Sequence, residues 1–133
     1  MVLFLGEESR LSKYESGMDK RRAVLGDDHV DRAVAATTDL DRGFQHWITE
    51  TAWEGVWSRP GLDDRTRSLI TIALLAAGGH DEIDLHLRAA RNTGATEAEI
   101  AEALMHVAVY AGVPAANAAF AAMKRISDEV PDE

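Results

Sequence analysis

The sequence contains no cysteine among its 133 residues. This absence excludes disulfide bonds, thiol nucleophiles, cysteine-ligated zinc, iron–sulfur clusters and C-x-x-C redox chemistry. Basic residues are also scarce: 14 lysines and arginines stand against 23 aspartates and glutamates, so the formal net charge is −9. Because nucleic acids and anionic membranes both bind basic surfaces, this charge argues against either as a partner.

Long hydrophobic runs are missing as well. The most apolar run covers residues 69–79, whereas a membrane-spanning helix needs roughly 20 apolar residues. Residues 107–123 are also apolar, but glycine, proline and asparagine interrupt them. The first ten residues, MVLFLGEESR, lack the basic segment that precedes the apolar part of a signal peptide. We therefore expect a cytoplasmic protein.

What is present is typical of one globular domain. The chain is 46% hydrophobic and 28% charged, and its length allows a single modest core. No alternation of apolar and polar residues predicts a useful strand. The pattern therefore predicts an all-α fold: a single compact helical domain of about six to seven helices. We expect it to cover residues 13–130, with residues 1–12 as an N-terminal extension.

Capping residues and glycines set the expected helix ends. Asp63 or Asp64 can begin a helix, and Thr96 with Glu99 forms a T-x-x-E capping box. The expected helices cover residues 11–25, 29–36, 39–57, 64–77 and 81–93, followed by one after Thr96 and one after Gly112.

Two helices have distinctive apolar patterns. In helix 39–57 a stripe at i, i+3, i+4 spacing predicts the buried face, and it consists of Phe44, Trp47, Ile48, Thr51 and Ala52. The second pattern is in residues 69–77, which are apolar on every face. This predicts a helix buried on all sides.

Helix 81–93 carries the most promising acid–base pair. Helical spacing places His86 on its apolar face, one turn after Glu82. A carboxylate at i−4 can orient the imidazole and raise its pKa, which suits a general acid near neutral pH. The alternative is a core histidine satisfied by a backbone carbonyl. On the opposite face, we expect Arg88 to face solvent and pair with Asp84 at i, i+4 spacing.

A metal site made of His80, Glu82 and His86 is a weak alternative. His80 precedes the helix, and no third strong ligand has matching spacing. We therefore predict no bound metal.

Arginine and tryptophan gather between residues 53 and 67. Arginine forks bind carboxylates, so Arg59 and Arg67 indicate a small anionic ligand. Arg67 could instead form a structural ion pair with a neighbouring acid. Trp57 lies beside the Arg-Pro-Gly turn, where a tryptophan is more often core than ligand wall. Tyr110 and Asn117 are polar groups on apolar helices, and each needs a partner if it is buried.

Five segments closely resemble the carboxymuconolactone decarboxylase family. They are Tyr14–Arg32, Trp53–Leu62, Arg65–Leu69, Leu85–Ala90 and Val109–Phe120. The match covers about residues 14–128, in order and in register. It implies an all-α fold that assembles into a ring-like hexamer, a trimer of dimers. It also implies decarboxylation of 4-carboxymuconolactone, without a cofactor, in the β-ketoadipate pathway of protocatechuate breakdown.

The wider superfamily also contains alkylhydroperoxidase-like proteins with a C-x-x-C-x-x-x-H motif. Aligning that histidine on His86 places Gly79 and Glu82 where the two cysteines would be. The chain therefore resembles the decarboxylase branch and cannot perform the disulfide chemistry.

This resemblance suggests a role for each candidate residue. His86 would donate the proton or stabilise the oxyanion, with Glu82 orienting it. The residues expected to bind substrate are Arg67, Arg59, Trp57, Tyr110 and Asn117. Two alternatives are a related lactone decarboxylase or isomerase acting on another small dicarboxylate, and a non-catalytic oligomeric binding protein.

Overall fold

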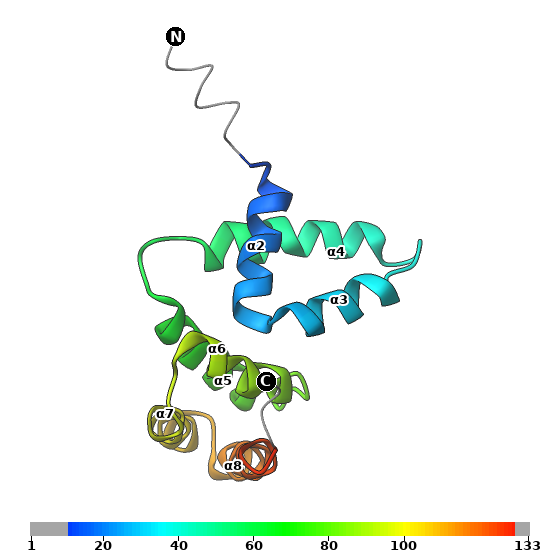
Figure 1. Cartoon of the computed structure of the whole chain (residues 1–133). Helices are drawn as coiled ribbons and strands as arrows, with labels where there is room; N and C mark the ends of the chain where they lie inside the picture. Colours follow the sequence, from blue (N-terminus) through cyan, green and yellow to red (C-terminus); the bar gives the residue numbers. More distant parts are fainter. Residues whose placement is uncertain (1–10, 130–133) are drawn as a thin grey trace. The chain divides into compact units, whose positions relative to one another are not determined.

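A computed structural model of the chain describes residues 11–129 and confirms the all-α prediction. These residues form seven α-helices and one π-helix, with no strand among them (Figure 1). Within this part of the chain, no helix is long and apolar enough to cross a membrane. The chain divides into two compact units, residues 1–60 and residues 61–133, called unit 1 and unit 2 below. The domain limits expected from the sequence stay a prediction.

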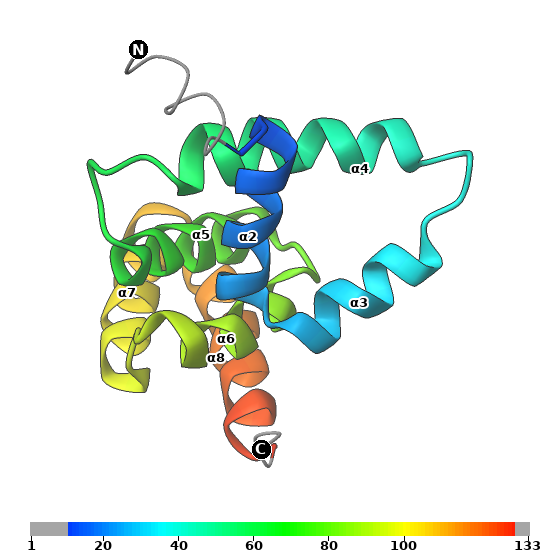
Figure 2. The ribbon, with the colours of Figure 1, turned by 45° about the horizontal axis from the view of Figure 1, so that its top comes forward.

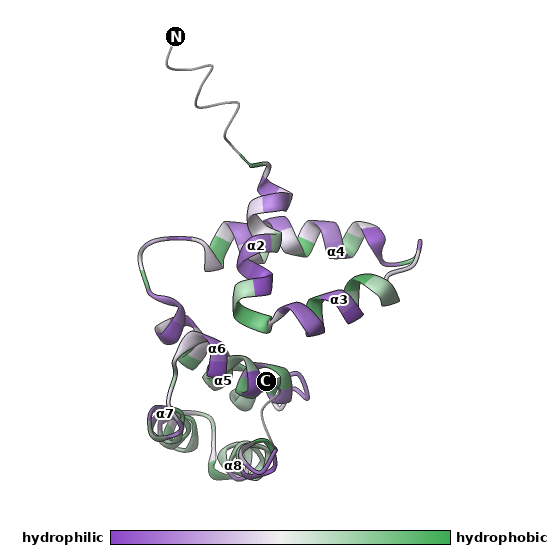
Figure 3. Cartoon of the chain, in the orientation of Figure 1, coloured by the Kyte–Doolittle hydropathy of each residue, from purple (hydrophilic) through white to green (hydrophobic). Residues whose placement is uncertain are grey.

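Unit 1 contains helices α2 (Lys13–Leu25), α3 (Asp27–Ala36) and α4 (Arg42–Ile48) and the π-helix η1 (Thr49–Trp57). Helix α2 starts at a capping box: the Glu15 N–H donates to the Ser12 hydroxyl at 3.0 Å, and the Ser12 N–H donates to Glu15 Oε1 at 2.9 Å. Most of α2 is hydrophilic, and its last turn is hydrophobic (Figure 3). That turn carries the buried Val24 and Leu25. Gly26, with φ of 92°, ends the helix where the sequence predicts.

Helix α2 packs closely against η1 at Gly17. A Cβ at Gly17 would lie 2.3 Å from the Thr49 carbonyl oxygen. Only glycine therefore allows the two helices this separation, and the packing of unit 1 depends on it.

The helix expected over residues 39–57 differs from the observed one. It begins at Arg42 as α4 and changes at Thr49 into η1. The predicted stripe is wrong: Phe44 and Trp47 are 57% and 56% exposed, whereas Thr49, Trp53 and Trp57 are buried. The prediction assumed 3.6 residues per turn, and the i→i+5 turns of a π-helix break that period.

Unit 2 contains helices α5 (Asp64–Gly78), α6 (Ile83–Thr93), α7 (Glu97–Tyr110) and α8 (Val113–Ser127). Helix α5 packs against each of the other three, and α7 and α8 lie side by side (Figures 1 and 2). Ile72 and Leu104 are fully buried at the centre of the core. Ala116, Ala119 and Ala122 form the buried face of α8. These small side chains let neighbouring helices approach closely.

The caps of unit 2 confirm several sequence predictions. The Asp63 carboxylate accepts the Thr66 N–H at 2.8 Å at the start of α5. Thr96 and Glu99 form the expected capping box at the start of α7. Gly79 and Gly94, both with positive φ, end α5 and α6.

The burial expected for α5 is wrong. Its buried residues are Ser68, Ile72 and Ala76, which lie on one face, whereas Leu74 is 67% exposed and Ile70 is also exposed. The helix is apolar on all sides, but only one of them is buried by the part of the chain that the structure describes.

Candidate active site

The start of α6 places the expected acid–base pair together. Glu82 is the N-cap residue of α6, and His86 follows one turn later. The His86 side chain is buried, with the residue 6% exposed, and its Nε2 lies 3.8 Å from Glu82 Oε2. The Glu82 side chain is 67% exposed. At this distance the pair interacts electrostatically, without a direct hydrogen bond between these two atoms. The imidazole therefore lies in the interior, with a solvated carboxylate close to one of its nitrogens.

Arg67 lies in the first turns of α5 and is half-buried. Its N–H donates to the Asp63 carbonyl at 3.0 Å, and its carbonyl accepts the Thr71 hydroxyl at 2.8 Å. The backbone of Arg67 is thus fixed by the capped end of the helix. Nearby, Arg65 pairs with Glu99 of α7 and joins α5 to α7.

Trp57 and Arg59 belong to unit 1. Trp57 is the last residue of η1 and is buried, with its ring stacked on that of Trp53 at a centroid distance of 5.3 Å. Arg59 is exposed, and its N–H donates to the Val56 carbonyl at 3.1 Å. The π-helix therefore ends in a buried pair of stacked indoles, two residues before an exposed arginine.

Tyr110 and Asn117 lie on the surface of unit 2. Tyr110 is 85% exposed at the end of α7, where its ring stacks on His106 at 6.1 Å. Asn117 is exposed on α8. Water can satisfy both polar groups in this chain, so neither needs the buried partner considered from the sequence.

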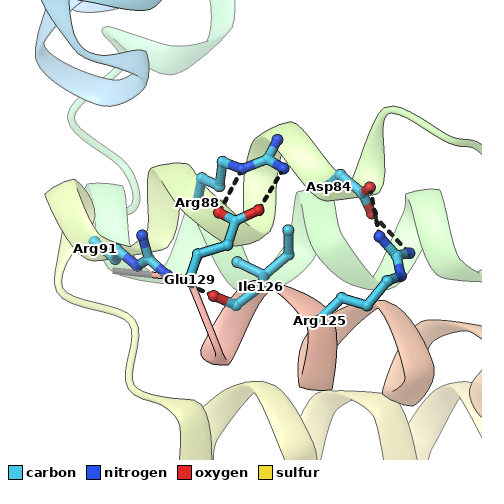
Figure 4. Close-up of polar contacts among 6 residues, drawn as sticks. All are labelled: Asp84, Arg88, Arg91, Arg125, Ile126 and Glu129. Atoms are coloured by element: carbon cyan, nitrogen blue, oxygen red, sulfur yellow. Dashed lines mark hydrogen bonds and ion pairs between the residues drawn. The ribbon is translucent and has the colours of Figure 1, made fainter. Parts of the chain in front are cut away.

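The expected pairing of Arg88 with Asp84 is wrong. Arg88 donates from Nε and Nη2 to the two carboxylate oxygens of Glu129, at 2.9 and 2.8 Å (Figure 4). Asp84 instead pairs with Arg125 of α8 at 3.0 Å, and Arg91 donates to the Ile126 carbonyl at 2.7 Å. These contacts join the outer face of α6 to the C-terminal end of α8. They hold α6 in place from the side opposite to His86.

These arginine contacts also change the acidity of their partners. The Arg88 hydrogen bonds hold the pKa of the Glu129 carboxyl below its ordinary value. In return, bonding to Glu129 and to Asp84 raises the pKa of Arg88 and of Arg125. The partner residues lie 41 positions apart, which explains why local spacing could not predict them.

A pocket of about 240 Å³ lies in unit 2 between the end of α5, the start of α6 and α8. Alanines of α8 form its apolar wall, and His80, Asp81, Asp84 and Arg125 supply its polar groups. Neither His86 nor Glu82 lines it. The His80 ring packs on Gly78, where an added Cβ would lie 2.5 Å from its Nε2.

The positions of His80, Glu82 and His86 do not support the metal site considered from the sequence. In the part of the chain that the structure describes, no three His, Asp or Glu side chains are grouped so that they could hold a metal ion.

One buried basic residue was missed in the sequence. Arg21 lies in the charged run D-K-R-R, which is typical of a solvated helix face, yet it is only 8% exposed. The available signal was helical spacing, because Arg21 is four residues after Gly17 and four before Leu25, both of which are buried.

Comparison with known proteins agrees with this architecture. A sequence model of the carboxymuconolactone decarboxylase family matches residues 42–125. A 4-carboxymuconolactone decarboxylase of Acinetobacter baylyi is 49% identical over 108 residues, which cover 80% of this chain and 81% of the relative. A nitrosuccinic acid decarboxylase of Metarhizium robertsii is 43% identical over 119 residues, covering 88% and 83%. The chain therefore belongs to the carboxymuconolactone decarboxylase family.

Proposed function

We propose that the protein is a carboxy-lyase that converts 4-carboxymuconolactone to β-ketoadipate enol-lactone and CO2 in protocatechuate breakdown, without a cofactor. The observation that carries the proposal is the buried imidazole of His86 beside the Glu82 carboxylate at the start of α6. Support also comes from the family and from the two relatives named as decarboxylases. A cytoplasmic location is part of the same proposal.

The chemistry of the substrate explains why no cofactor is needed. The departing carboxylate is attached to a ring carbon that is conjugated, through the ring double bond, to the lactone carbonyl. When the bond to CO2 breaks, its electron pair moves to the carbonyl oxygen and forms a furan-like dienolate. Addition of one proton to the ring carbon next to the carbonyl then gives the enol-lactone. The protein must hold two carboxylates, stabilise the oxyanion and deliver this proton.

The candidate residues match these three tasks. His86 is proposed to deliver the proton or stabilise the oxyanion, and Glu82 to orient the imidazole. Arg67 and Arg59 are proposed to bind the substrate carboxylates, since guanidinium forks suit them. The proposed wall of the site consists of Trp57, Tyr110 and Asn117. Apolar surroundings such as the buried Trp57 favour the loss of a carboxylate as neutral CO2.

The proposed assembly is a homo-oligomer, a hexamer arranged as a trimer of dimers. Large apolar side chains exposed on unit 2 support it, because association would remove them from water. They include Leu74 of α5, Val109 of α7 and Val113 of α8. Tyr110 lies among them in sequence, so a second copy that covers this surface would also enclose Tyr110.

A direct assay tests the reaction. Purified protein is incubated with 4-carboxymuconolactone, made from protocatechuate by the preceding enzymes, and loss of lactone and release of CO2 are followed. We expect a rate well above that of a protein-free blank. Nitrosuccinic acid, assayed in parallel, should give a lower kcat/KM. Turnover of the lactone no faster than the blank would refute the proposal. A higher kcat/KM for nitrosuccinic acid would mean that nitrosuccinic acid, and not the lactone, is the substrate.

Replacing Arg67 tests the binding of the substrate carboxylate. Arg67→Ala should mainly raise KM, by about tenfold or more, because a charge-assisted hydrogen bond contributes about 1.5–3 kcal/mol. Arg88→Ala is the matched control, since Arg88 faces Glu129 on the outer side of α6 and should leave KM unchanged. An unchanged KM in Arg67→Ala, together with a lower melting temperature, would instead make Arg67 a structural residue.

A further inference from the structure

Unit 1 contains a second pocket, of about 400 Å³, between α2, α3 and the helix formed by α4 and η1. Its polar lining consists of Arg21, Arg42 and His46, which carry or can carry positive charge, and the neutral Tyr14, Gln45 and Thr49, with Thr37 at the end of α3. Among the described residues that line it, none is acidic. The pocket is thus positive on a chain whose formal net charge is −9. None of the residues assigned above to decarboxylation lines it.

Arg21 is the buried cation of this pocket. It is 8% exposed, and its two terminal nitrogens donate to Thr49 Oγ1 at 3.3 Å and to Gln45 Oε1 at 3.2 Å. Both acceptors are neutral. Within residues 11–129 the Arg21 Nε forms no hydrogen bond, and no carboxylate forms an ion pair with the guanidinium. Each terminal nitrogen has a second N–H beyond the bond described.

Several other arginines of the chain, in contrast, pair with carboxylates. Arg22, the next residue, pairs with Asp27 at 3.1 Å and Asp31 at 2.9 Å. Arg88 and Arg125 pair with carboxylates as well. These pairs are more exposed than Arg21, although a buried charge needs a counterion more. Burial lowers the pKa of Arg21, but a guanidinium keeps its proton at neutral pH. The charge is therefore present and lacks an anionic partner in the described chain.

The walls of the pocket suit an organic anion better than a simple inorganic one. Tyr14 stacks on the His46 ring with a centroid distance of 4.6 Å and an interplanar angle of 5°, which creates a flat aromatic surface. Met18 and Val34 add apolar surface from α2 and α3. The exposed Arg42 pairs with Asp39, and His46 Nε2 lies 3.5 Å from Glu50, so Arg21 is the cation with no carboxylate of its own.

We propose that this pocket of unit 1 binds a small organic carboxylate, whose charge Arg21 neutralises and whose apolar body lies against Tyr14, Met18 and Val34. The site is separate from the one proposed for decarboxylation. It gives unit 1 a ligand of its own, and the inference does not depend on the identity of the decarboxylated substrate.

Calorimetric titration of the full chain tests this site. Benzoate is the probe, benzamide is its neutral match, and inorganic phosphate represents an anion without an apolar body. Benzoate should bind, whereas benzamide and phosphate should bind at least about tenfold more weakly, as expected for a charge-assisted bond plus apolar contact. Equal binding of benzoate and benzamide would overturn the proposal, as would no binding of benzoate.

Variants locate the bound probe. Arg21→Gln should weaken benzoate binding by at least about tenfold, and Arg21→Lys, which keeps the charge, should recover part of the affinity. Arg67→Ala should leave it unchanged. If Arg21→Gln fails to fold, Tyr14→Ala, at the edge of the pocket, tests the same site. It should weaken the binding of benzoate more than the binding of phosphate. Unchanged benzoate affinity in the folded variants would overturn the proposal.

Two further measurements exclude other occupants. Benzoate should not compete with 4-carboxymuconolactone in the decarboxylase assay, and competitive inhibition would refute a separate site. Sedimentation of wild type and Arg21→Gln should give the same oligomeric state. A change of state, with no benzoate bound to the wild type, would mean that a carboxylate side chain of a second copy fills the pocket, and it would refute the small-molecule site.

Discussion

The two units each bury a basic side chain, but they surround it differently. In unit 1, Arg21 contacts the neutral oxygens of Thr49 and Gln45. In unit 2, His86 lies 3.8 Å from a carboxylate oxygen of Glu82. A guanidinium keeps its proton at all physiological pH values, whereas an imidazole gains and loses one near neutrality. Unit 1 thus surrounds a permanent charge with neutral acceptors, whereas unit 2 places an imidazole beside a carboxylate. This difference is the basis of the two proposals, an anion site in unit 1 and proton transfer by His86 in unit 2.

The two units also differ in how regular their helices are. Unit 1 joins α2 to a π-helix, a conformation that is rare and is frequent at functional sites. Unit 2 joins regular α-helices around a core with fully buried Ile72 and Leu104. Unit 2 therefore has the more regular interior, which would hold the proposed proton donor, His86, in one orientation.

The largest expected effect is the loss of a core side chain in unit 2. Leu104→Ala should lower the free energy of unfolding by about 2–5 kcal/mol, because it leaves a cavity at a position with no exposed surface. Chemical denaturation followed by far-UV circular dichroism measures this loss.

Tryptophan fluorescence extends this test to unit 1. All three tryptophans, Trp47, Trp53 and Trp57, lie in unit 1, so their emission reports on that unit. We expect the fluorescence midpoint of Leu104→Ala to change less than the circular dichroism midpoint. Equal changes in both midpoints would show that the two units unfold as one.

The second effect concerns the buried histidine. His86→Ala should lower kcat by at least about 10²-fold if the imidazole transfers the proton. His80→Ala is the control, because His80 is exposed and packs on Gly78 outside α6, and near-normal turnover is expected. Near-normal turnover in His86→Ala would return His86 to the role of a core residue.

Local signals in the sequence were sufficient for most helix ends. Asp63, the Thr96–Glu99 box and Gly94 act through neighbours in the chain, and a helix end depends mainly on such neighbours. The His86–Glu82 pair is also local, because Glu82 caps the start of α6 and His86 follows one turn later. Its geometry could therefore be predicted, whereas its catalytic role stays a prediction.

Long-range contacts limited what the sequence could predict. Arg88 has a local acid at Asp84, but Glu129, 41 residues away, offers a bidentate contact instead. Phe44 and Trp47 lie on a regular stripe, yet the change from α-helix to π-helix buries other residues. Arg21 lies in a charged run that is typical of a solvated surface, but it shares a helix face with the buried Gly17. In each case tertiary packing overrides a local pattern.

The third prediction tests the close packing in unit 1. Gly17→Ala should lower the free energy of unfolding by about 1–3 kcal/mol, because the new methyl group would lie 2.3 Å from the Thr49 carbonyl oxygen and force α2 away from η1. Gly43→Ala is the matched control, since a Cβ there meets nothing within 4 Å. It should stabilise α4 by up to about 1 kcal/mol.

Tryptophan fluorescence during denaturation measures both glycine variants, because Trp53 and Trp57 lie on the π-helix that Gly17 contacts. If Gly17→Ala were as stable as Gly43→Ala, α2 and η1 would not be held at this separation.

The smallest expected effect compares the two capping boxes, one in each unit. Bonding to the cap residue lowers the pKa of Glu15 and of Glu99 below the ordinary value of 4.5. A carboxyl whose pKa is lower in the folded state stabilises the fold above about pH 4.5 and loses this contribution as the pH falls through its folded pKa. Glu99 also bonds to Arg65, whereas the bonds described for Glu15 go to Ser12 alone.

Glutamine keeps the capping geometry but does not titrate in this range, so Glu15→Gln and Glu99→Gln separate the charge from the cap. Each variant should lose less stability than the wild type when the pH is lowered from 7 to about 3.5. The difference should be larger for Glu99→Gln, because that substitution also removes the charge that pairs with Arg65. Thermal melts at the two pH values measure it. A larger difference for Glu15→Gln would mean that the ion pair between Arg65 and Glu99 adds nothing to the acid sensitivity beyond that of a capping box.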